Sequence, residues 1–220
     1  MLIIFDLDDT LIDTAGTILS FRQKAAFEKM VRAGLCKKTF QLKQFVALDQ
    51  KSISSKEALK KFLGEESPYY AIGYKEIYES EALPELISLT PGALEVLNEL
   101  KKENTLAIVS YGIDRIQHIK IKKAGLDRGI FSTIDVCKST DKSMAYQKVF
   151  ENFKGSSEDV IAEDVIVCGD RERDLKPAKE LGFRTVHMRW GRGKDLHVEA
   201  DASIQTLSEM VSLIKWDKKK

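Results

Sequence analysis

After residue 90, short apolar runs alternate regularly with helix-like segments, and this feature restricts the possible fold more than any other. The apolar runs span residues 105–109, 130–136, 165–168, 184–188 and 202–204. Segments with helical periodicity lie between them. Strands that alternate with helices in this way form a parallel sheet covered by helices. The sequence therefore predicts an α/β fold, a parallel Rossmann-like sheet flanked by helices.

Residues 15–88 interrupt this alternation. Their apolar residues recur at helical spacing and form no convincing strand. The stripes are Ile18, Phe21, Ala25 and Met30, then Ala58, Leu59, Phe62 and Leu63, then Ile72, Ile77 and Tyr78. We interpret the segment as an insertion that folds as a small bundle over the carboxyl edge of the sheet. Residues 1–14 and 89–220 then form the α/β core domain, and residues 15–88 form an α-helical cap domain.

The first apolar run, residues 2–5, leads directly into the acidic segment of residues 6–10. Asp6 and Asp8 are two residues apart, so their side chains point to the same side of an extended strand. Open α/β sheets bind ligands at the carboxyl ends of their strands. Two adjacent carboxylates resist joint ionisation unless a cation or a shared proton intervenes. The pair predicts a hard metal ion, a nucleophile with an acid/base partner, or both.

A second strand-end acidic group follows residues 165–168, where the sequence continues with Gly169-Asp170 and reaches Asp174 four residues later. A single group of this kind is also typical of a solvated turn. Two such groups, each after an apolar strand, favour a shared site, because parallel strands bring their carboxyl ends to one edge.

Composition excludes several functional classes. The formal net charge is +1, which favours neither nucleic acid nor a membrane as partner. No apolar run reaches 18 residues, and the amino terminus enters a strand without a signal-peptide pattern. Cys36, Cys137 and Cys168 are odd in number and widely spaced, so they predict buried thiols in a reducing cytosol. We expect a cytoplasmic protein; its oligomeric state stays open.

Four elements in this order resemble the haloacid dehalogenase (HAD) superfamily of phosphatases over the whole chain. Residues 6–10 are similar to its first motif, Asp-x-Asp-x-Thr. The other three are Ser110 after a strand, Lys142 at a helix start, and Gly169-Asp170 with Asp174. The helical insertion is similar to the cap that one branch of the superfamily carries between its first two motifs.

The resemblance implies a magnesium-dependent phosphatase that hydrolyses a small phosphorylated metabolite through an aspartyl-phosphate. Asp6 is then the nucleophile, and Asp8 protonates the leaving oxygen before it deprotonates water. Asp6 and Asp170 are the expected carboxylate ligands of Mg²⁺, and the backbone carbonyl of Asp8 is a third. Asp174 is expected in the outer shell of the metal.

The remaining site residues are expected to handle phosphate charge and loop geometry. Ser110 would donate a hydrogen bond to a phosphoryl oxygen, and Lys142 would bring positive charge to that group and to Asp6. Lys138 competes with Lys142 for this role. Thr10 is expected to tie down the loop after the first strand through side-chain-to-backbone bonds. His118, His187 and His197 have no partner at metal-ligand spacing and are assigned no catalytic role.

Several alternatives stay open at this stage. A phosphotransferase or mutase would keep all four motifs, and a phosphonate hydrolase would need a cap lysine, for which Lys24 and Lys29 are candidates. A haloacid dehalogenase needs no acid at position 8, so Asp8 argues against that activity. A different class is a non-catalytic module that binds a phosphorylated ligand, which the presence of both Asp6 and Asp8 disfavours.

Overall fold

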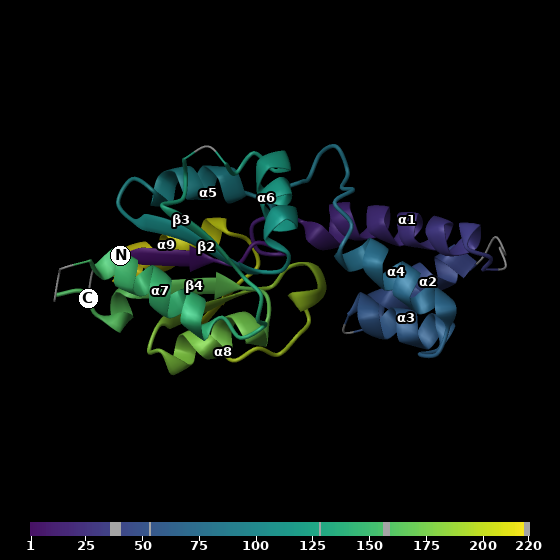
Figure 1. Cartoon of the computed structure of the whole chain (residues 1–220). Coiled ribbons are helices and arrows are strands. Elements are labelled where there is room, and N and C mark those ends of the chain that lie inside the picture. The colour runs from purple at the N-terminus through teal and green to yellow at the C-terminus, as the bar shows by residue number, and fades with distance from the viewer. Residues whose placement is uncertain (36–40, 53, 128, 156–158, 218–220) are drawn as a thin grey trace. The chain divides into compact units, whose positions relative to one another are not determined.

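A computed structural model describes residues 1–35, 41–52, 54–127, 129–155 and 159–217 of the chain (Figure 1). The chain divides into two compact units, Met1–Thr14 with Leu86–Lys220, and Ala15–Glu85. The sequence-based boundaries are residues 14 and 88. Cys168 is buried and Cys137 is half-buried, whereas Cys36 lies outside the described residues.

The first unit is built on a six-stranded parallel sheet with the order β3-β2-β1-β4-β5-β6. Its strands are β1 (Leu2–Phe5), β2 (Thr105–Tyr111), β3 (Thr133–Cys137), β4 (Val165–Gly169), β5 (Arg184–Met188) and β6 (Ala202–Ile204). The central strand β1 pairs with β2 and β4, so that Ile4 lies between Ala107 and Val167. The predicted α/β fold with a parallel sheet is confirmed.

Helices cover both faces of this sheet. They are α5 (Ala93–Leu100), α6 (Asp114–Lys123), α7 (Ser143–Lys154), α8 (Glu172–Glu180) and α9 (Ser208–Asp217). Helices α7 and α8 pack on one face, whereas α5 and α6 lie on the opposite face and α9 packs against α5 (Figure 1). Short helical turns lie at η2 (Ala162–Asp164) and η3 (Gly191–Gly193).

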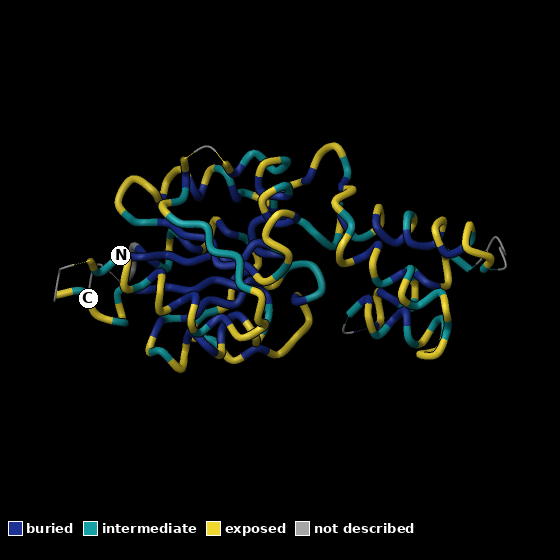
Figure 2. Tube along the Cα trace, viewed as in Figure 1, coloured by how far each residue is buried: buried dark blue, intermediate teal, exposed yellow. Residues whose placement is uncertain are grey.

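The core of this unit follows from the double cover of the sheet. All four residues of β1 are fully buried (Figure 2), because both faces of a parallel sheet are shielded from water. Leu2 and Ile4 belong to the cluster that also contains Tyr146 of α7 and Leu175 of α8. The Tyr146 hydroxyl donates to the backbone carbonyl of Asp174 at 2.9 Å. This bond joins the two helices that begin beside the site described below.

The second unit consists of helices. They are η1 (Thr14–Ile18), which begins at the last residue of the first unit, α1 (Leu19–Arg32), α2 (Gln41–Gln50), α3 (Ser55–Leu63) and α4 (Pro68–Tyr78). Helix α1 packs on α4, and α2 packs on α3, around a core that includes Met30, Phe45 and Leu59. Arg22 is buried and donates to the carbonyl oxygens of Ile77 and Ser80 at the end of α4, so its guanidinium has a structural role.

Within the described residues, no helix is both long and apolar enough to cross a membrane.

The α7–α8 contact generates a stability prediction. We expect Tyr146→Phe to lower the free energy of unfolding by about 1 kcal/mol, because the Asp174 carbonyl loses a buried hydrogen bond while the ring still fills its space. Urea unfolding followed by circular dichroism measures this change. An unchanged free energy would mean that the bond does not hold the two helices together.

Candidate active site

The order of the strands brings the carboxyl ends of β1 and β4 together. The sheet runs from β1 to β2 and β3 in one direction and from β4 to β6 in the other, so β1 and β4 are neighbours at the switch point. Asp6 directly follows β1, and Asp170 directly follows β4. The Asp6 N–H donates to the carbonyl of Cys168 at 2.9 Å, which extends the pairing to the end of both strands. Ligands of open α/β sheets bind at this point.

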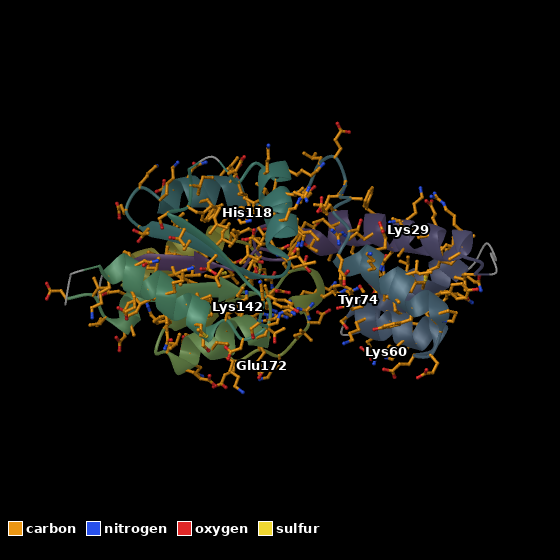
Figure 3. The ribbon with its side chains drawn as sticks, viewed as in Figure 1. Lys29, Lys60, Tyr74, His118, Lys142 and Glu172 are labelled. Atoms are coloured by element: carbon orange, nitrogen blue, oxygen red, sulfur yellow. The ribbon has the colours of Figure 1, made fainter. Side chains whose placement is uncertain are left out.

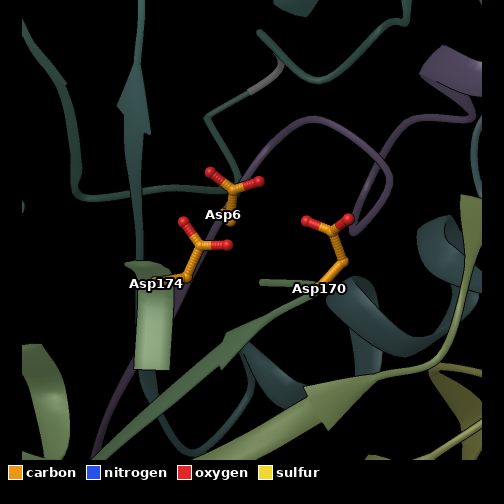
Figure 4. Close-up of side chains that lie close together, drawn as sticks. All are labelled: Asp6, Asp170 and Asp174. Atoms are coloured by element: carbon orange, nitrogen blue, oxygen red, sulfur yellow. The ribbon is translucent and has the colours of Figure 1, made fainter. Parts of the chain in front are cut away.

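Three buried carboxylates meet there, and we call Asp6, Asp170 and Asp174 the acidic cluster (Figure 4). One oxygen from each lies within 4.8 Å of the others. Asp174 belongs to the first turn of α8, and it comes so close to β4 that a Cβ at Gly169 would lie 2.6 Å from its Cβ. Position 169 therefore requires glycine. The cluster includes Asp174 directly, whereas the sequence placed this residue in an outer shell.

Lys142 is the positive charge inside this cluster. Its Nζ lies 2.6 Å from Asp6 Oδ1 and 2.7 Å from Asp174 Oδ1, and it also donates to the carbonyl of Val109 at 3.0 Å. The side chain is fully buried at the start of α7 (Figure 3). Lys138, the competing candidate, is exposed. Of the two lysines, the structure brings Lys142 to Asp6.

Burial disfavours the ionised forms of the carboxyl groups in the acidic cluster. Burial raises the pKa of Asp6 to about 6, against the attraction of Lys142 and with the repulsion of Asp174 and Asp8. Burial, followed by repulsion from Asp174 and Asp6, raises the pKa of Asp170 well above its ordinary value although Arg171 Nε lies 2.9 Å away. Lys142 and Arg171 form ion pairs with these carboxylates, and the charge of Arg173 also acts on them. Hard oxygen donors gathered at one buried point fit a divalent ion such as Mg²⁺.

The carboxylate of Asp8 occupies a different environment. Its Oδ1 accepts from the hydroxyl of Thr14 and from Lys120 Nζ at 2.7 Å. Its Oδ2 accepts from Gln117 Nε2 and from Lys120 Nζ, both at 2.9 Å. Burial alone would raise the pKa of Asp8, but the charge of Lys120 and these hydrogen bonds outweigh it and lower the pKa to about 2. The side chain is outside the acidic cluster. The metal ligand expected from Asp8 is its backbone carbonyl, and that expectation stays a prediction.

Ser110 and Thr10 are the two hydroxyl residues predicted for the site, and both are buried. The buried Ser110 hydroxyl oxygen accepts from Gln117 Nε2 at 2.6 Å, so its own proton can be donated to another acceptor. Thr10 does not make the expected side-chain bonds, because its buried hydroxyl has no hydrogen-bond partner among the described residues. The loop is instead tied by the Thr90 hydroxyl, which donates to the Thr10 carbonyl at 2.8 Å.

Sequence reasoning missed two residues of α6, Gln117 and Lys120. Both lie on the buried face of the helix with Ile116 and Ile121. The spacing of positions 116, 117, 120 and 121 is the signal that could have found them, because these positions share one helix face. His118 between them is exposed. His187 is buried in β5 and His197 is exposed, and neither belongs to the acidic cluster.

Further contacts within the first unit involve residues next to Ser110 and next to the acidic loops. The guanidinium of Arg173 lies 5.7 Å from the ring centroid of Tyr111, the residue after Ser110. The turn η3 approaches both acidic loops, because a Cβ at Gly191 would collide with the Asp9 carboxylate and a Cβ at Gly193 would lie 3.0 Å from Asp170 Cβ. The glycines of this turn permit that close approach.

Known proteins resemble the chain in sequence. The family model of haloacid dehalogenase-like hydrolases matches residues 3–188. A glyceraldehyde 3-phosphate phosphatase from Methanocaldococcus jannaschii is 27% identical, with 99% of this chain and 98% of the relative covered. An enzyme of the same name from Pyrococcus furiosus is 26% identical, with 97% and 92% covered.

Solved structures resemble the fold. The HAD-hydrolase YfnB from Bacillus subtilis, in a structure bound to magnesium, has a TM-score of 0.62 and 18% identity and covers 97% of this chain and 98% of its own. A predicted phosphoglycolate phosphatase from Haemophilus somnus has a TM-score of 0.71 and 18% identity, with 97% of each chain covered. At this identity the likeness concerns the fold.

The ion pairs of Lys142 generate a second stability prediction. We expect Lys142→Met to lower the free energy of unfolding by about 3–5 kcal/mol in the presence of a chelator, because Asp6 and Asp174 would lose their buried counter-charge. Lys138→Met is the matched control, and its exposed position predicts a nearly unchanged free energy. Urea unfolding compares the two. Equal effects would show that Lys142 does not balance the acidic cluster.

The raised pKa values of Asp6 and Asp170 generate a prediction for how the stability of the protein depends on pH and on Mg²⁺. A folded-state pKa above the ordinary value means that the stability contributed by Asp6 is present below about pH 4 and is lost as the pH rises through about 6. Asp170→Asn replaces a buried carboxyl group, whose ionised form burial and repulsion disfavour, with a neutral amide. We therefore expect the metal-free variant to melt about 2–4 °C higher than the original protein at pH 7, for a gain on the order of 1 kcal/mol.

Thermal melts with a chelator and with Mg²⁺ check this expectation. Added Mg²⁺ should raise the melting temperature of the original protein and should raise that of Asp170→Asn much less. A variant that is less stable than the original protein without metal, or that gains equally from Mg²⁺, would contradict the assignment of Asp170.

Proposed function

The chain belongs to the haloacid dehalogenase-like hydrolase family and is a phosphoric monoester hydrolase, and on this premise we propose that it cleaves a small phosphorylated metabolite through a phosphorylated Asp6, with Mg²⁺ as cofactor. The observation that carries the proposal is the pairing of two carboxylates in unlike environments. Asp6 lies in the acidic cluster beside Lys142, and Asp8 lies outside it beside Gln117, whose amide also donates to Ser110.

The nucleophile in this proposal is a carboxylate oxygen of Asp6. It attacks phosphorus, and the bond from phosphorus to the ester oxygen breaks as the new bond forms. The leaving oxygen takes a proton from Asp8. In the second half of the reaction a water attacks the phosphoryl group, Asp8 accepts a proton from this water, and Asp6 is released as a carboxylate together with inorganic phosphate.

Asp8 must carry a proton before it can act as an acid. In the free protein its pKa is about 2, which keeps it ionised near neutral pH. A phosphate group that enters beside Asp8 brings negative charge, and this charge favours the protonated form of the carboxyl group. The low pKa suits the second half of the reaction, in which an ionised Asp8 accepts the proton of the attacking water.

Lys142 and Ser110 stabilise the charge that the reaction moves. Lys142 Nζ lies 2.6 Å from Asp6 Oδ1 and so holds the orientation of this carboxylate. Its positive charge also balances the negative charge that spreads over the phosphoryl oxygens. The Ser110 hydroxyl accepts from Gln117 and therefore has its proton available for a phosphoryl oxygen. The carboxylates of Asp6, Asp170 and Asp174 would hold Mg²⁺, which when bound supplies charge neutralisation between the nucleophile and the phosphate dianion.

The substrate is proposed from the relatives. Two relatives that match nearly the whole chain are named glyceraldehyde 3-phosphate phosphatases, which supports a small sugar phosphate as substrate. A magnesium-bound structural neighbour supports the choice of metal. Glyceraldehyde 3-phosphate is therefore the first compound to test, within a panel of phosphorylated metabolites.

We expect the protein to release phosphate from at least one member of this panel with Mg²⁺ and to lose this activity with a chelator. Asp6→Asn should reduce kcat by more than about 10³-fold, because an amide is a poor nucleophile toward phosphorus. Asp127→Asn, which changes an exposed carboxylate, is the matched control and should keep full activity. Undiminished turnover by Asp6→Asn would remove Asp6 as the nucleophile.

A further inference from the structure

Helix α6 presents two polar side chains to the carboxylate of Asp8. Lys120 Nζ contacts both carboxylate oxygens, at 2.7 and 2.9 Å. Gln117 Nε2 contacts Oδ2 at 2.9 Å, and the Thr14 hydroxyl donates to Oδ1. Each oxygen therefore has two donors. A carboxylate with this many fixed donors has little freedom to rotate about its χ angles.

The burial of Lys120 indicates that this contact is its role. Only 9% of the residue is exposed, and an ammonium group is costly to bury unless it is paired and hydrogen-bonded. The neighbouring lysine Lys122 on the same helix is exposed. The helix thus directs one lysine to Asp8 and another to solvent, which provides a matched pair for experiment.

We propose that Lys120, together with Gln117, positions the Asp8 carboxyl group for proton transfer to and from the phosphoryl site. This inference rests on the proposed function, in which Asp8 is the acid and base. Lys120 and Gln117 act through Asp8, so they are positioning residues.

Gln117 links Asp8 to the phosphate-binding hydroxyl. The side-chain amide nitrogen carries two N–H groups. It donates to Asp8 Oδ2 at 2.9 Å and to Ser110 Oγ at 2.6 Å, so one amide sets the spacing between the acid and the serine. Gly112 leaves room for this side chain, since a Cβ there would lie 3.2 Å from Gln117 Cδ at a φ of +156°.

The dependence of rate on the leaving group tests this role. Phenyl phosphate releases a weakly acidic phenol that benefits from proton donation, whereas 2,4-dinitrophenyl phosphate releases an anion that is stable without a proton. The ratio kcat/KM reports the steps up to the phosphorylation of Asp6. A loss that depends on the leaving group therefore reports on proton donation, and an equal loss on both esters reports on binding, metal or fold.

Removing the Lys120 charge makes Asp8 easier to protonate, but it also removes the contacts that fix the carboxyl group in place. If orientation is what Lys120 supplies, we expect Lys120→Met to reduce kcat/KM for phenyl phosphate by about 10- to 100-fold and to leave the value for 2,4-dinitrophenyl phosphate nearly unchanged. Lys120→Arg should restore part of the loss, because a guanidinium can contact both carboxylate oxygens. The control Lys122→Met should match the original protein on both esters. Gln117→Leu should lower kcat/KM for phenyl phosphate more than for 2,4-dinitrophenyl phosphate, with a smaller loss common to both esters because Ser110 also loses its donor. It keeps the test valid where Lys120→Met fails to fold.

Equal losses on the two esters, or no loss on either, in both variants would overturn the positioning role. An original protein that cleaves neither ester nor any member of the metabolite panel with Mg²⁺ would instead overturn the proposed function. The two failures are therefore distinguishable, because the first requires an active original protein.

Discussion

The burial of three carboxylates together at the β1–β4 switch point is the constraint on which the rest of the site depends. Asp6, Asp170 and Asp174 lie within 4.8 Å of one another in a part of the protein that excludes water. Such a group costs stability unless positive charge is placed next to it. Lys142, Arg171 and Arg173 supply positive charge, and burial with mutual repulsion still keeps the pKa values of Asp6 and Asp170 raised. A site that needs a further cation is suited to bind a metal ion and, through it, a phosphate dianion.

The local geometry separates the two acids that follow β1 although they are only two residues apart. Asp6 has a raised pKa because it is buried with like charges, whereas Asp8 has a lowered pKa because Lys120, Gln117 and Thr14 hold its charged form. Unlike environments for neighbouring carboxyl groups are typical of sites where one group is a nucleophile and the other transfers protons. The metal would act on Asp6 and not on the side chain of Asp8, so the two roles can be tuned independently.

Much of this arrangement follows from sequence because it depends on strand order. Asp6 and Asp170 each end an apolar run, and parallel strands bring such ends to one edge, so their meeting was predictable. Asp174 was harder to place, since its contact depends on how closely α8 approaches Gly169. Gln117 and Lys120 were missed because a helix rich in lysine is usually solvated, and only the fold shows that one lysine faces Asp8. The tie of the first loop comes from Thr90, which is 80 residues away from Thr10 and carries no local signal.

The central claim is that the acidic cluster holds one divalent ion beside the oxygen that becomes phosphorylated. A crystal structure of the protein with Mg²⁺ and beryllium fluoride, a mimic of a phosphoryl group on a carboxylate, tests it most directly. The account predicts the fluoride adduct on an oxygen of Asp6, Mg²⁺ bound by carboxylates of the acidic cluster, and Asp8 still held by Lys120. An adduct on another residue, or a metal ion bound away from Asp6 and Asp170, would contradict it.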